Sequence, residues 1–294
     1  MAGKSSISRK VFMVINIFFF ICIGLLCLLP FVNIFAISLS SSSAAARGSV
    51  GLLPLEFSVK SYEYVIQKPD FITALLVSVK RVALGLGIGL FLTIMTAYPL
   101  SKEKSNFRFR TFYVWYFVFT ILFGGGLIPF YMIVRNLGMI NTIWALVIPS
   151  SLNVFNAVIL LNYFRGLPRE LEESAFIDGA GHWTLLWKVY VPLSVPVLAT
   201  LTLFTVVGHW NSWFDGMIFM TKPSNFPLQT YMQSIIIQPN SKILTKEAAL
   251  RFRVINERTV KSAQIFIGAL PVLMLYPFLQ RYFITGLVLG SVKE

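Results

Sequence analysis

The sequence predicts an all-α polytopic membrane protein, because it is apolar throughout, poor in charge and free of strand patterning. Hydrophobic residues make up 56% of the 294 residues and charged residues only 13%, and the mean hydropathy is +0.74. Soluble domains usually carry about 25% charged residues, which form their hydrated surface. The short alternating segments of a membrane β-barrel are missing from the sequence. A helical integral membrane protein is therefore expected.

Six stretches with little or no charge are long enough to cross a membrane. A helix needs roughly 20 apolar residues to span the hydrocarbon core, and it satisfies its own backbone hydrogen bonds there. The first stretch is longer than the core of a signal peptide, about 7–15 residues, so a retained helix is favoured over a cleaved signal. One membrane domain over 1–294 is expected, with helices at about residues 11–39, 73–100, 111–134, 140–162, 197–221 and 263–286.

The connecting segments bear on orientation. An even number of spans puts both termini on one side of the membrane. The 25 Lys and Arg residues divide almost equally between the two sides, so their total number does not decide the orientation. The dense bases of 101–110 favour cytoplasmic termini under the positive-inside rule. Segment 163–196 is then cytoplasmic, and segment 222–262 is periplasmic or extracellular. The bases of 222–262 form either a solvated face or a surface that docks an acidic binding protein or an acidic glycan.

Two groups of glycines predict features of the helices. Gly85 and Gly89 have the small-xxx-small spacing that lets two membrane helices approach closely. The run Gly124–Gly126 is expected to loosen or break the helix at 111–134, either for tight packing or as a gate that moves.

A compact acidic segment lies between the fourth and fifth expected helices. Glu170, Glu172, Glu173 and Asp178 are four of the twelve acidic residues of the chain and fall within nine positions. Pro168 and these acids suit the first turn of a helix, and the following glycines suit its end. The expected helix of about ten residues, roughly 15 Å long, is too short and too charged to span a membrane. We interpret it as a docking element, with an ordinary solvated loop helix as the alternative.

The same segment resembles the EAA loop of ABC importer permeases. Residues 173–192 read E-S-A-x3-G-x9-V-x-V-P, where the family pattern is E-A-A-x3-G-x9-I-x-L-P. The spacing matches throughout, and the departures at Ser174, Val189 and Val191 are conservative. Residues 125–183 and 270–294 also look like carbohydrate-importer permeases similar to the second membrane subunit of the maltose importer. They resemble still more closely the permeases of complex-oligosaccharide importers, including alginate importers.

This resemblance implies a set of partners and a place in the cell. It implies a bacterial inner-membrane (cytoplasmic-membrane) importer with cytoplasmic N- and C-termini, built from this chain, a second and different permease, two copies of an ATPase subunit and a periplasmic or lipid-anchored solute-binding protein. ATP and Mg are then bound by the ATPases, and this chain binds no cofactor of its own. The family's EAA helix is seated in an ATPase cleft, which fixes 163–196 as cytoplasmic. The residues implied to couple to the ATPase are Glu172, Glu173, Ser174, Ala175, Asp178, Gly179, Ala180 and Gly181.

Polar and aromatic residues in the fourth and fifth expected helices form a candidate sugar path. Amides hydrogen-bond hydroxyl groups, and indole rings stack on the C–H faces of sugars. Interhelical hydrogen bonds or an aromatic belt at the membrane interface are the alternatives. The candidates are Asn153, Asn156, His209, Trp210, Asn211 and Trp213, whereas Asp215 is expected to pair with a base or cap a helix. The net charge of +13 favours, weakly, acidic oligosaccharides of the uronate or alginate type.

The sequence predicts transport without catalysis by this chain. It has no Walker A motif, no metal-ligand spacing and no assignable nucleophile set, and it has no soluble basic domain for nucleic acid. Its other expected contacts are oligosaccharide and membrane lipid. The alternative is a secondary sugar transporter driven by an ion gradient. Such transporters typically show internal repeats and ionisable groups in the membrane, and neither a repeat nor a buried charge pair is expected here.

Overall fold

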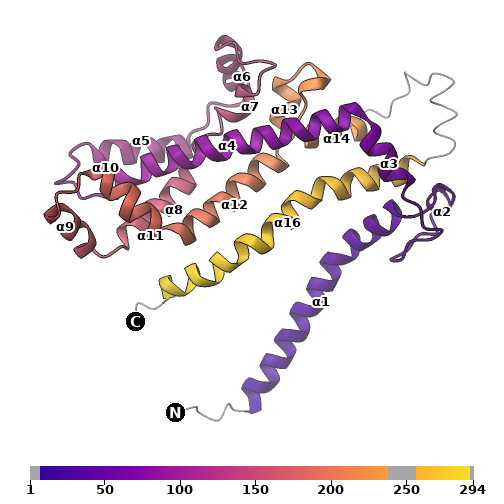
Figure 1. The fold of residues 1–294 in the computed structure, drawn as a ribbon, viewed down its shortest axis with the longest axis horizontal. Helices are drawn as coiled ribbons and strands as arrows, with labels where there is room; N and C mark the ends of the chain where they lie inside the picture. The colour runs from indigo at the N-terminus through magenta and orange to yellow at the C-terminus, as the bar shows by residue number, and fades with distance from the viewer. Residues whose placement is uncertain (1–6, 238–255, 292–294) are drawn as a thin grey trace. The chain divides into compact units, whose positions relative to one another are not determined.

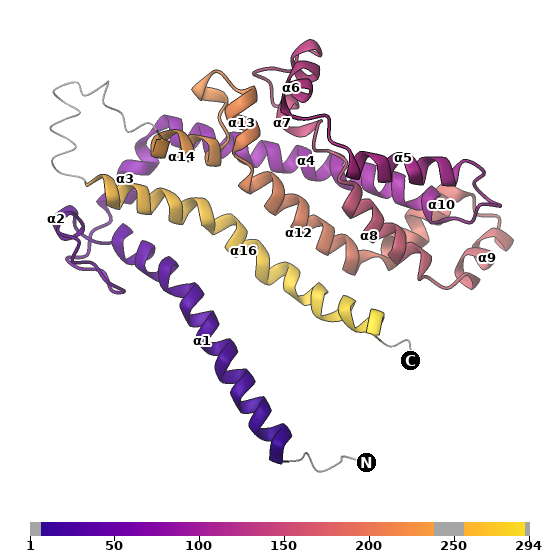
Figure 2. The same cartoon turned by 180° about the vertical axis from the view of Figure 1, so that it is seen from behind.

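The structure is a computed structural model that describes residues 7–237 and 256–291. Every regular element in these two ranges is a helix (Figures 1 and 2), which confirms the predicted all-α class. The chain forms two compact units, unit 1 with Met1–Pro69 and Gln238–Leu270, and unit 2 with Asp70–Ile237 and Pro271–Glu294. The single membrane domain stays a prediction.

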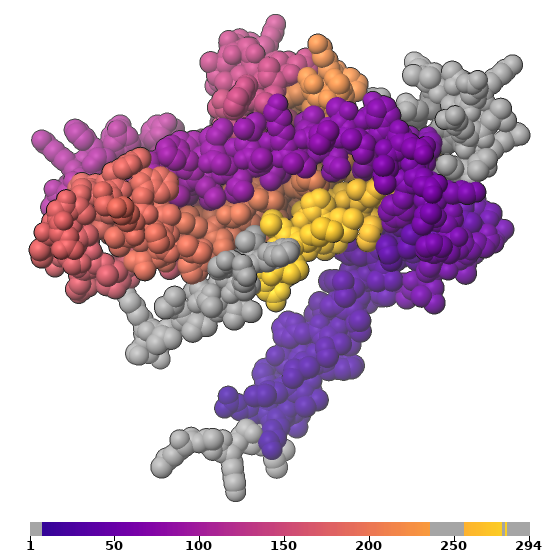
Figure 3. Space-filling view, viewed as in Figure 1, coloured from indigo at the N-terminus to yellow at the C-terminus, as the bar shows by residue number. Residues whose placement is uncertain are grey.

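Unit 1 begins with a long helix whose side chains face outward on all sides. Helix α1 (Ile7–Ser38) is 32 residues long with Pro30 inside it. Almost every side chain in its first 25 residues is exposed, and they form the rod of indigo atoms in Figure 3. A helix that is hydrophobic all round is typical of one surrounded by lipid. Unit 1 continues with α2 (Ser42–Ala46), α3 (Lys60–Gln67) and the first part of α16 (Glu257–Ser291).

Unit 2 is organised along α4 (Pro69–Ser101), a helix of 33 residues. Its buried residues recur every three or four positions, so they form one stripe along the helix: Phe71, Ala74, Ser78, Arg81, Gly85, Gly89, Thr93, Ala97 and Leu100. Helices α8 (Val154–Arg165) and α12 (Val195–Asn211) lie along α4 in both views (Figures 1 and 2). Side chains from α4, α8, α12 and the segment before α12 share one apolar core.

Three helices of the described residues are long and apolar enough to cross a membrane by themselves. They lie in α1, α4 and the part of α16 from Glu257 to Pro277. Two bent pairs raise the number to five: α5 (Arg110–Leu122) with α6 (Leu127–Asn136), bent by 115°, and His182–Leu193 with α12, bent by 80°. Helix α8 is apolar but shorter. Each of the six expected stretches therefore contains helix, but only three of them contain an uninterrupted span.

The third expected helix breaks at its glycines. Residues 123–126 separate α5 from α6, and Gly126 has a φ of +81°, a conformation that residues with a Cβ rarely adopt. The expectation of a break at Gly124–Gly126 is confirmed. The continuous helix 111–134 is not found.

The fourth and fifth expected helices are also discontinuous. The expected helix 140–162 is α7 (Trp144–Val147) followed by α8, because Pro149 lacks a backbone donor and Asn153 caps a new helix. The expected helix 197–221 ends with α12 at Asn211 and resumes as α13 (Phe214–Phe219). Beyond it lie a 3₁₀ turn (Pro223–Asn225) and α14 (Leu228–Ile237). Most bases of the expected outer segment fall in 238–255, outside the described residues.

The close approach expected at Gly85 and Gly89 is confirmed. A Cβ on Gly85 would lie 2.3–2.7 Å from three atoms of the His209 ring on α12. A Cβ on Gly89 would lie 3.0 Å from the carbonyl oxygen of Ser151 and 3.7 Å from Thr205. Glycine at these two positions lets α12 and the start of the α8 segment lie directly on α4.

This packing predicts different effects for two glycines on opposite faces of α4. Gly85→Ala should destabilise the chain by about 1–3 kcal/mol, the usual cost of overpacking, because His209 is only 6% exposed and has little room to move. Gly87→Ala is the control, since nothing lies within 4 Å of a Cβ at that position and alanine favours helix more than glycine. Thermal unfolding of the purified chain in detergent should show a lower Tm for Gly85→Ala alone. Equal melting temperatures would contradict the close contact.

Candidate functional site

The acidic segment folds as a short helix with a defined end. Helix α9 runs over Glu170–Ile177, two residues shorter than expected. Gly179 N–H donates to the Phe176 carbonyl at 3.0 Å and Ala180 N–H donates to the Ala175 carbonyl at 2.9 Å. This pair of bonds is the Schellman arrangement, which needs a left-handed residue just after the helix. Gly179 provides it with a φ of +78°.

The acidic residues of α9 divide between two faces. Glu172 is half-buried and turns toward the rest of unit 2, whereas Glu170, Glu173 and Asp178 are exposed. The exposed face also carries Ile177, whose side chain is 86% exposed. Of the other predicted coupling residues, Ser174, Gly179 and Gly181 are exposed, and Ala175 and Ala180 are partly buried. The exposed surface of α9 thus combines acidic residues with apolar side chains, of which Ile177 is more exposed than Leu171 and Phe176.

Glu172 attaches α9 to the end of α4. The Lys102 ammonium, one residue beyond α4, donates to Glu172 Oε2 at 2.8 Å and to the Tyr190 hydroxyl at 2.9 Å. Tyr190 Oη also donates to Glu172 Oε2 at 2.8 Å. Lys102 Nζ lies 4.2 Å from the centre of the Tyr190 ring and 4.5 Å from that of Tyr98. We call these residues, Lys102, Glu172, Tyr190 and Tyr98, the α4–α9 cluster.

Burial and pairing act in opposite directions on the two charges of this cluster. Burial lowers the pKa of Lys102, and the interaction with Glu172 restores it only in part. Burial also acts to raise the pKa of Glu172, but the hydrogen bonds from Lys102 and Tyr190 outweigh it and hold that pKa below its usual range. The carboxylate is therefore ionised at neutral pH, and the ion pair with Lys102 is formed.

Aromatic contacts extend the cluster to the next helix. His182, the first residue of α10 (His182–Leu185), lies with Nδ1 3.1 Å from the Tyr98 hydroxyl. The rings of Tyr98 and Phe164 pack edge to face on Tyr190, which belongs to a π-helical turn (Leu186–Tyr190) before α11 (Val191–Leu193). The start and the end of the loop after α8 are thereby both held against α4.

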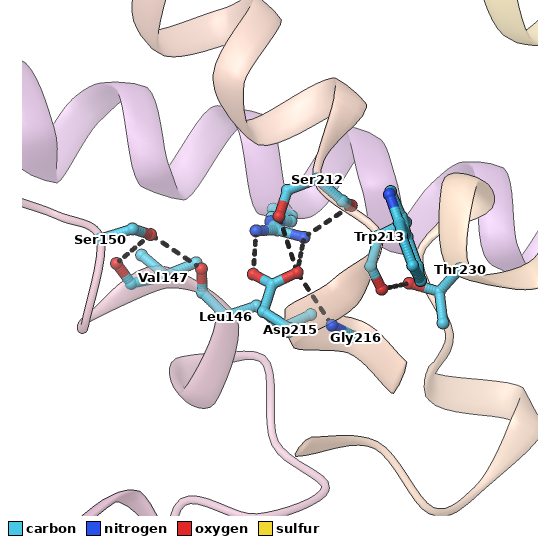
Figure 4. Close-up of polar contacts among 9 residues, drawn as sticks. Leu146, Val147, Ser150, Ser212, Trp213, Asp215, Gly216 and Thr230 are labelled. Carbon is cyan, nitrogen blue, oxygen red and sulfur yellow. Dashed lines mark hydrogen bonds and ion pairs between the residues drawn. The ribbon is translucent and has the colours of Figure 1, made fainter. Parts of the chain in front are cut away.

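A second ionic contact lies on the same face of α4. The Arg81 guanidinium, 1% exposed, pairs with Asp215 at the start of α13, whose side chain is 24% exposed. Arg81 Nη1 donates to Asp215 Oδ1 and to the Ser212 carbonyl, each at 3.2 Å, and Arg81 Nη2 donates to Asp215 Oδ2. Figure 4 shows that Asp215 also accepts from Ser212 Oγ and from the Gly216 N–H, both at 2.8 Å. The third guanidinium nitrogen, Arg81 Nε, is buried without a partner.

This pair corrects one expectation and confirms another. No buried charge pair was expected, yet Arg81 and Asp215 form one, because a guanidinium inside an apolar helix requires a counter-charge. The expectation that Asp215 pairs with a base is confirmed. The signal was present in the sequence, since Arg81 and Asp215 are opposite charges inside two expected spans, 73–100 and 197–221.

The candidate sugar-path residues take several positions. Asn153 is the N-cap of α8, and its Oδ1 accepts from the Asn156 N–H at 3.2 Å. His209 and Trp210 are buried near the end of α12, Asn211 is exposed, and Trp213 is 37% exposed. Ser151, which precedes α8, contacts α4 at Gly89, and His209 of α12 contacts α4 one turn away at Gly85. The candidates near α8 and those near the end of α12 therefore both lie beside α4. Their contact with sugar stays a prediction.

Neither a metal centre nor a disulfide is evident in the described part of the chain. No three His, Cys, Asp or Glu residues among residues 7–237 and 256–291 are grouped so that they could hold a metal ion. Cys22 and Cys27, both in α1, are free thiols.

Comparison with known proteins finds similarity along nearly the whole chain. Residues 85–288 match the family described as binding-protein-dependent transport system inner membrane component. Protein LplC of Bacillus subtilis (strain 168) is 38% identical over 284 residues, covering 97% of this chain and 95% of LplC. The polygalacturonan/rhamnogalacturonan transport system permease protein YtcP of the same organism is 34% identical over 275 residues, 94% of this chain and 96% of YtcP.

A solved structure extends this similarity to the fold. A chain from the crystal structure of a bacterial ABC transporter involved in the import of the acidic polysaccharide alginate superposes with a TM-score of 0.87. It is 31% identical, and the match covers 96% of this chain and 100% of that one. The fold is that of an ABC importer permease, as the EAA-like residues predicted.

The Arg81–Asp215 contact predicts an order of stabilities. Asp215→Asn leaves a guanidinium that is 1% exposed without its counter-charge, which costs about 3–5 kcal/mol in buried pairs. Arg81→Met should cost less, because Asp215 keeps two donors and is partly exposed. Arg47→Met is the control, since its pair with Glu56 is exposed on both sides and such pairs contribute about 0–1 kcal/mol. Thermal unfolding in detergent should rank Asp215→Asn lowest, then Arg81→Met, then Arg47→Met. The reverse order for the first two would contradict the burial of Arg81.

Proposed function

This chain belongs to the family of inner membrane components of binding-protein-dependent transport systems, and on that premise we propose that it is the permease subunit of an ATP-driven oligosaccharide importer whose ATPase engages α9. The single observation that carries the proposal is the exposed face of α9, an acidic surface around Ile177 on a helix that is fixed to α4 through Glu172. Such a helix can bind a partner on one side and transmit force on the other.

The geometry of α9 suits a groove with a basic rim. Glu170, Glu173 and Asp178 are free to meet cationic side chains, and Ile177 supplies an apolar contact at the centre of an interface. The resemblance of residues 173–192 to the EAA pattern supports an ATPase contact at α9. ATP and Mg are bound by two ATPase copies, and a second, different permease completes the membrane path. The solute-binding protein delivers the sugar from the opposite side.

Contact with an ATPase also sets the orientation. Because the ATPase acts in the cytoplasm, α9 and the loop 163–196 are cytoplasmic. With the six crossings expected from the sequence, the N- and C-termini are then cytoplasmic as well, and the chain lies in the bacterial inner membrane. The Arg81–Asp215 pair lies toward the opposite side, since Arg81 is about twenty residues of helix away from Lys102.

We assign acidic oligosaccharides as the substrate class. The descriptions of two similar proteins name polygalacturonan and alginate, and both of these are polymers of uronic acids. The net charge of +13 on this chain is opposite to the charge of such polymers. Asn156, His209, Asn211 and Trp213 remain the proposed contacts, because they combine hydrogen-bonding and stacking groups beside the breaks in two helices. The buried Arg81 is occupied by Asp215 and is not assigned to the sugar.

The Arg81–Asp215 pair is the one feature that favours the ion-driven alternative. In secondary transporters, ionisable groups in the membrane bind the coupling ion. Here the carboxylate is saturated by donors from Arg81, Ser212 and Gly216, and the family match supports the ATP-driven importer. Uptake by this chain alone, driven by an ion gradient, would reverse that preference.

The proposed ATPase contact predicts that two left-handed glycines, Gly179 after α9 and Gly138 after α6, differ. Gly179→Ala places a Cβ at a φ of +78°, which costs about 1–2 kcal/mol, and should loosen the end of α9 and weaken ATPase binding. Gly138→Ala is the matched control, because Gly138 has a φ of +69°, open space around it and a place outside the proposed contact. Co-purification of the ATPase with the assembled importer should fall for Gly179→Ala only. Unchanged recovery with both variants would contradict the role of α9.

The proposed substrate class predicts which sugars stimulate the importer. With the complete assembly and its binding protein in proteoliposomes, ATP hydrolysis should rise with oligouronates and not with neutral maltooligosaccharides of equal length. The preference should fade as salt rises from about 0.05 to 0.5 M, because charge recognition is screened. Equal stimulation by neutral sugars would contradict the assignment and leave the importer itself intact.

A further inference from the structure

Helix α4 has an ionic attachment at Arg81, and a second one lies at Lys102, one residue beyond its end. Lys102 binds Glu172 of α9 at 2.8 Å, and Arg81 binds Asp215 of α13 with both of its terminal nitrogens. The two basic residues are separated by roughly 30 Å, at 1.5 Å per residue. One helix therefore joins the acidic loop helix to the short helix beyond the break in α12.

Between these two attachments, α4 is a continuous helix that packs closely against its neighbours. The buried stripe of α4 is continuous from Arg81 to Leu100, and the glycines within it bring α12 and Ser151 into direct contact. The helix has no break between Arg81 and Lys102, and Pro99 lies in its last turn. Close-packed interfaces of this kind have discrete arrangements and do not deform continuously.

The two helices that these ion pairs hold, α9 and α13, each lie next to a break in the helical structure. Helix α9 is bounded by Pro168 and by the turn at Gly179. Helix α13 begins just after α12 ends at Asn211, and Ser212 and Trp213 interrupt the helix. Ser78 of α4 accepts from the Leu228 N–H at 2.7 Å, and Thr230 donates to the Trp213 carbonyl at 2.8 Å, which ties α14 to the same end.

From this arrangement we infer that α4 is the strut that carries movement of α9 to α13, and that Lys102 and Arg81 are its positioning residues. The inference rests on the proposed function, because it needs an ATPase that moves α9. The ion pairs are directional, and the Arg81–Asp215 pair is bidentate, so each end is fixed in angle as well as in distance. Without both attachments, the breaks beside α9 and α13 absorb the movement and ATP hydrolysis no longer drives transport.

A double-mutant cycle tests the strut. The assembled importer, with its partner permease, ATPases and binding protein, is reconstituted in proteoliposomes, and sugar uptake per ATP hydrolysed is measured. Lys102→Gln removes the charge from one attachment, and Arg81→Lys keeps the charge at the other but loses the bidentate geometry. Each variant should lower uptake per ATP about tenfold, within the usual range of coupling free energies, and leave ATP hydrolysis and assembly intact.

The double variant distinguishes a strut from two local roles. Sites this far apart usually act additively, so independent attachments should give about a hundredfold loss. A strut that is already disconnected at one end should lose nothing more when the other end is released, so the double variant should stay near tenfold. Additive losses, or single variants with normal uptake per ATP, would overturn the inference.

Two further variants complete the experiment. Glu103→Gln is the matched control, because its pair with Arg169 lies beside the same cluster but is exposed, and uptake per ATP should not change. If Arg81→Lys does not assemble, Asp215→Glu replaces it, since it keeps the charge pair and changes only the reach of the carboxylate. A wild-type chain that binds no ATPase would instead refute the proposed function.

Discussion

A charge placed inside an apolar helix must find its counter-charge within the protein, and this constraint organises unit 2. Arg81 satisfies it with Asp215, and Lys102, which is buried one residue beyond the same helix, pairs with Glu172. Neither contact is required for α4 to be a helix. Both require α9 and α13, which are short and follow breaks in the chain, to take defined positions against α4.

The glycines and the helix breaks help to place the other helices of unit 2 against α4. Glycine at 85 and 89 removes the side chains that would separate α4 from α12 and from Ser151, so the long helix can act as the common support. Elsewhere, glycine or a polar cap marks a helix boundary: Gly126 and Asn153 directly precede α6 and α8, and Gly179 follows the end of α9. A permease has to change between two packings, and rigid elements joined at such points allow this without loss of backbone hydrogen bonding inside the helices.

Local patterns in the sequence predicted more of this molecule than long-range contacts did. Apolar runs predicted where helices lie, and the EAA-like spacing predicted α9 and its glycine end, because both depend on residues close in sequence. The breaks at Pro149 and Ser212 were missed, since length and hydropathy do not report a local change of direction. The α4–α9 cluster was missed as well. Lys102 and Glu172 are 70 residues apart, and only the packing of α4 against α9 shows that this base selects Glu172 among four nearby acids.

The central claim is that α9 meets an ATPase while its inner face stays fixed to α4. Site-directed cross-linking tests it most directly, with a single cysteine at Ile177 in a chain whose Cys22 and Cys27 are replaced by serine. Ile177→Cys, exposed at the tip of α9, should cross-link to the ATPase subunit in the assembled importer, and Leu137→Cys, exposed beyond α6, should not. An intact assembly in which Ile177→Cys forms no cross-link to the ATPase would contradict the account.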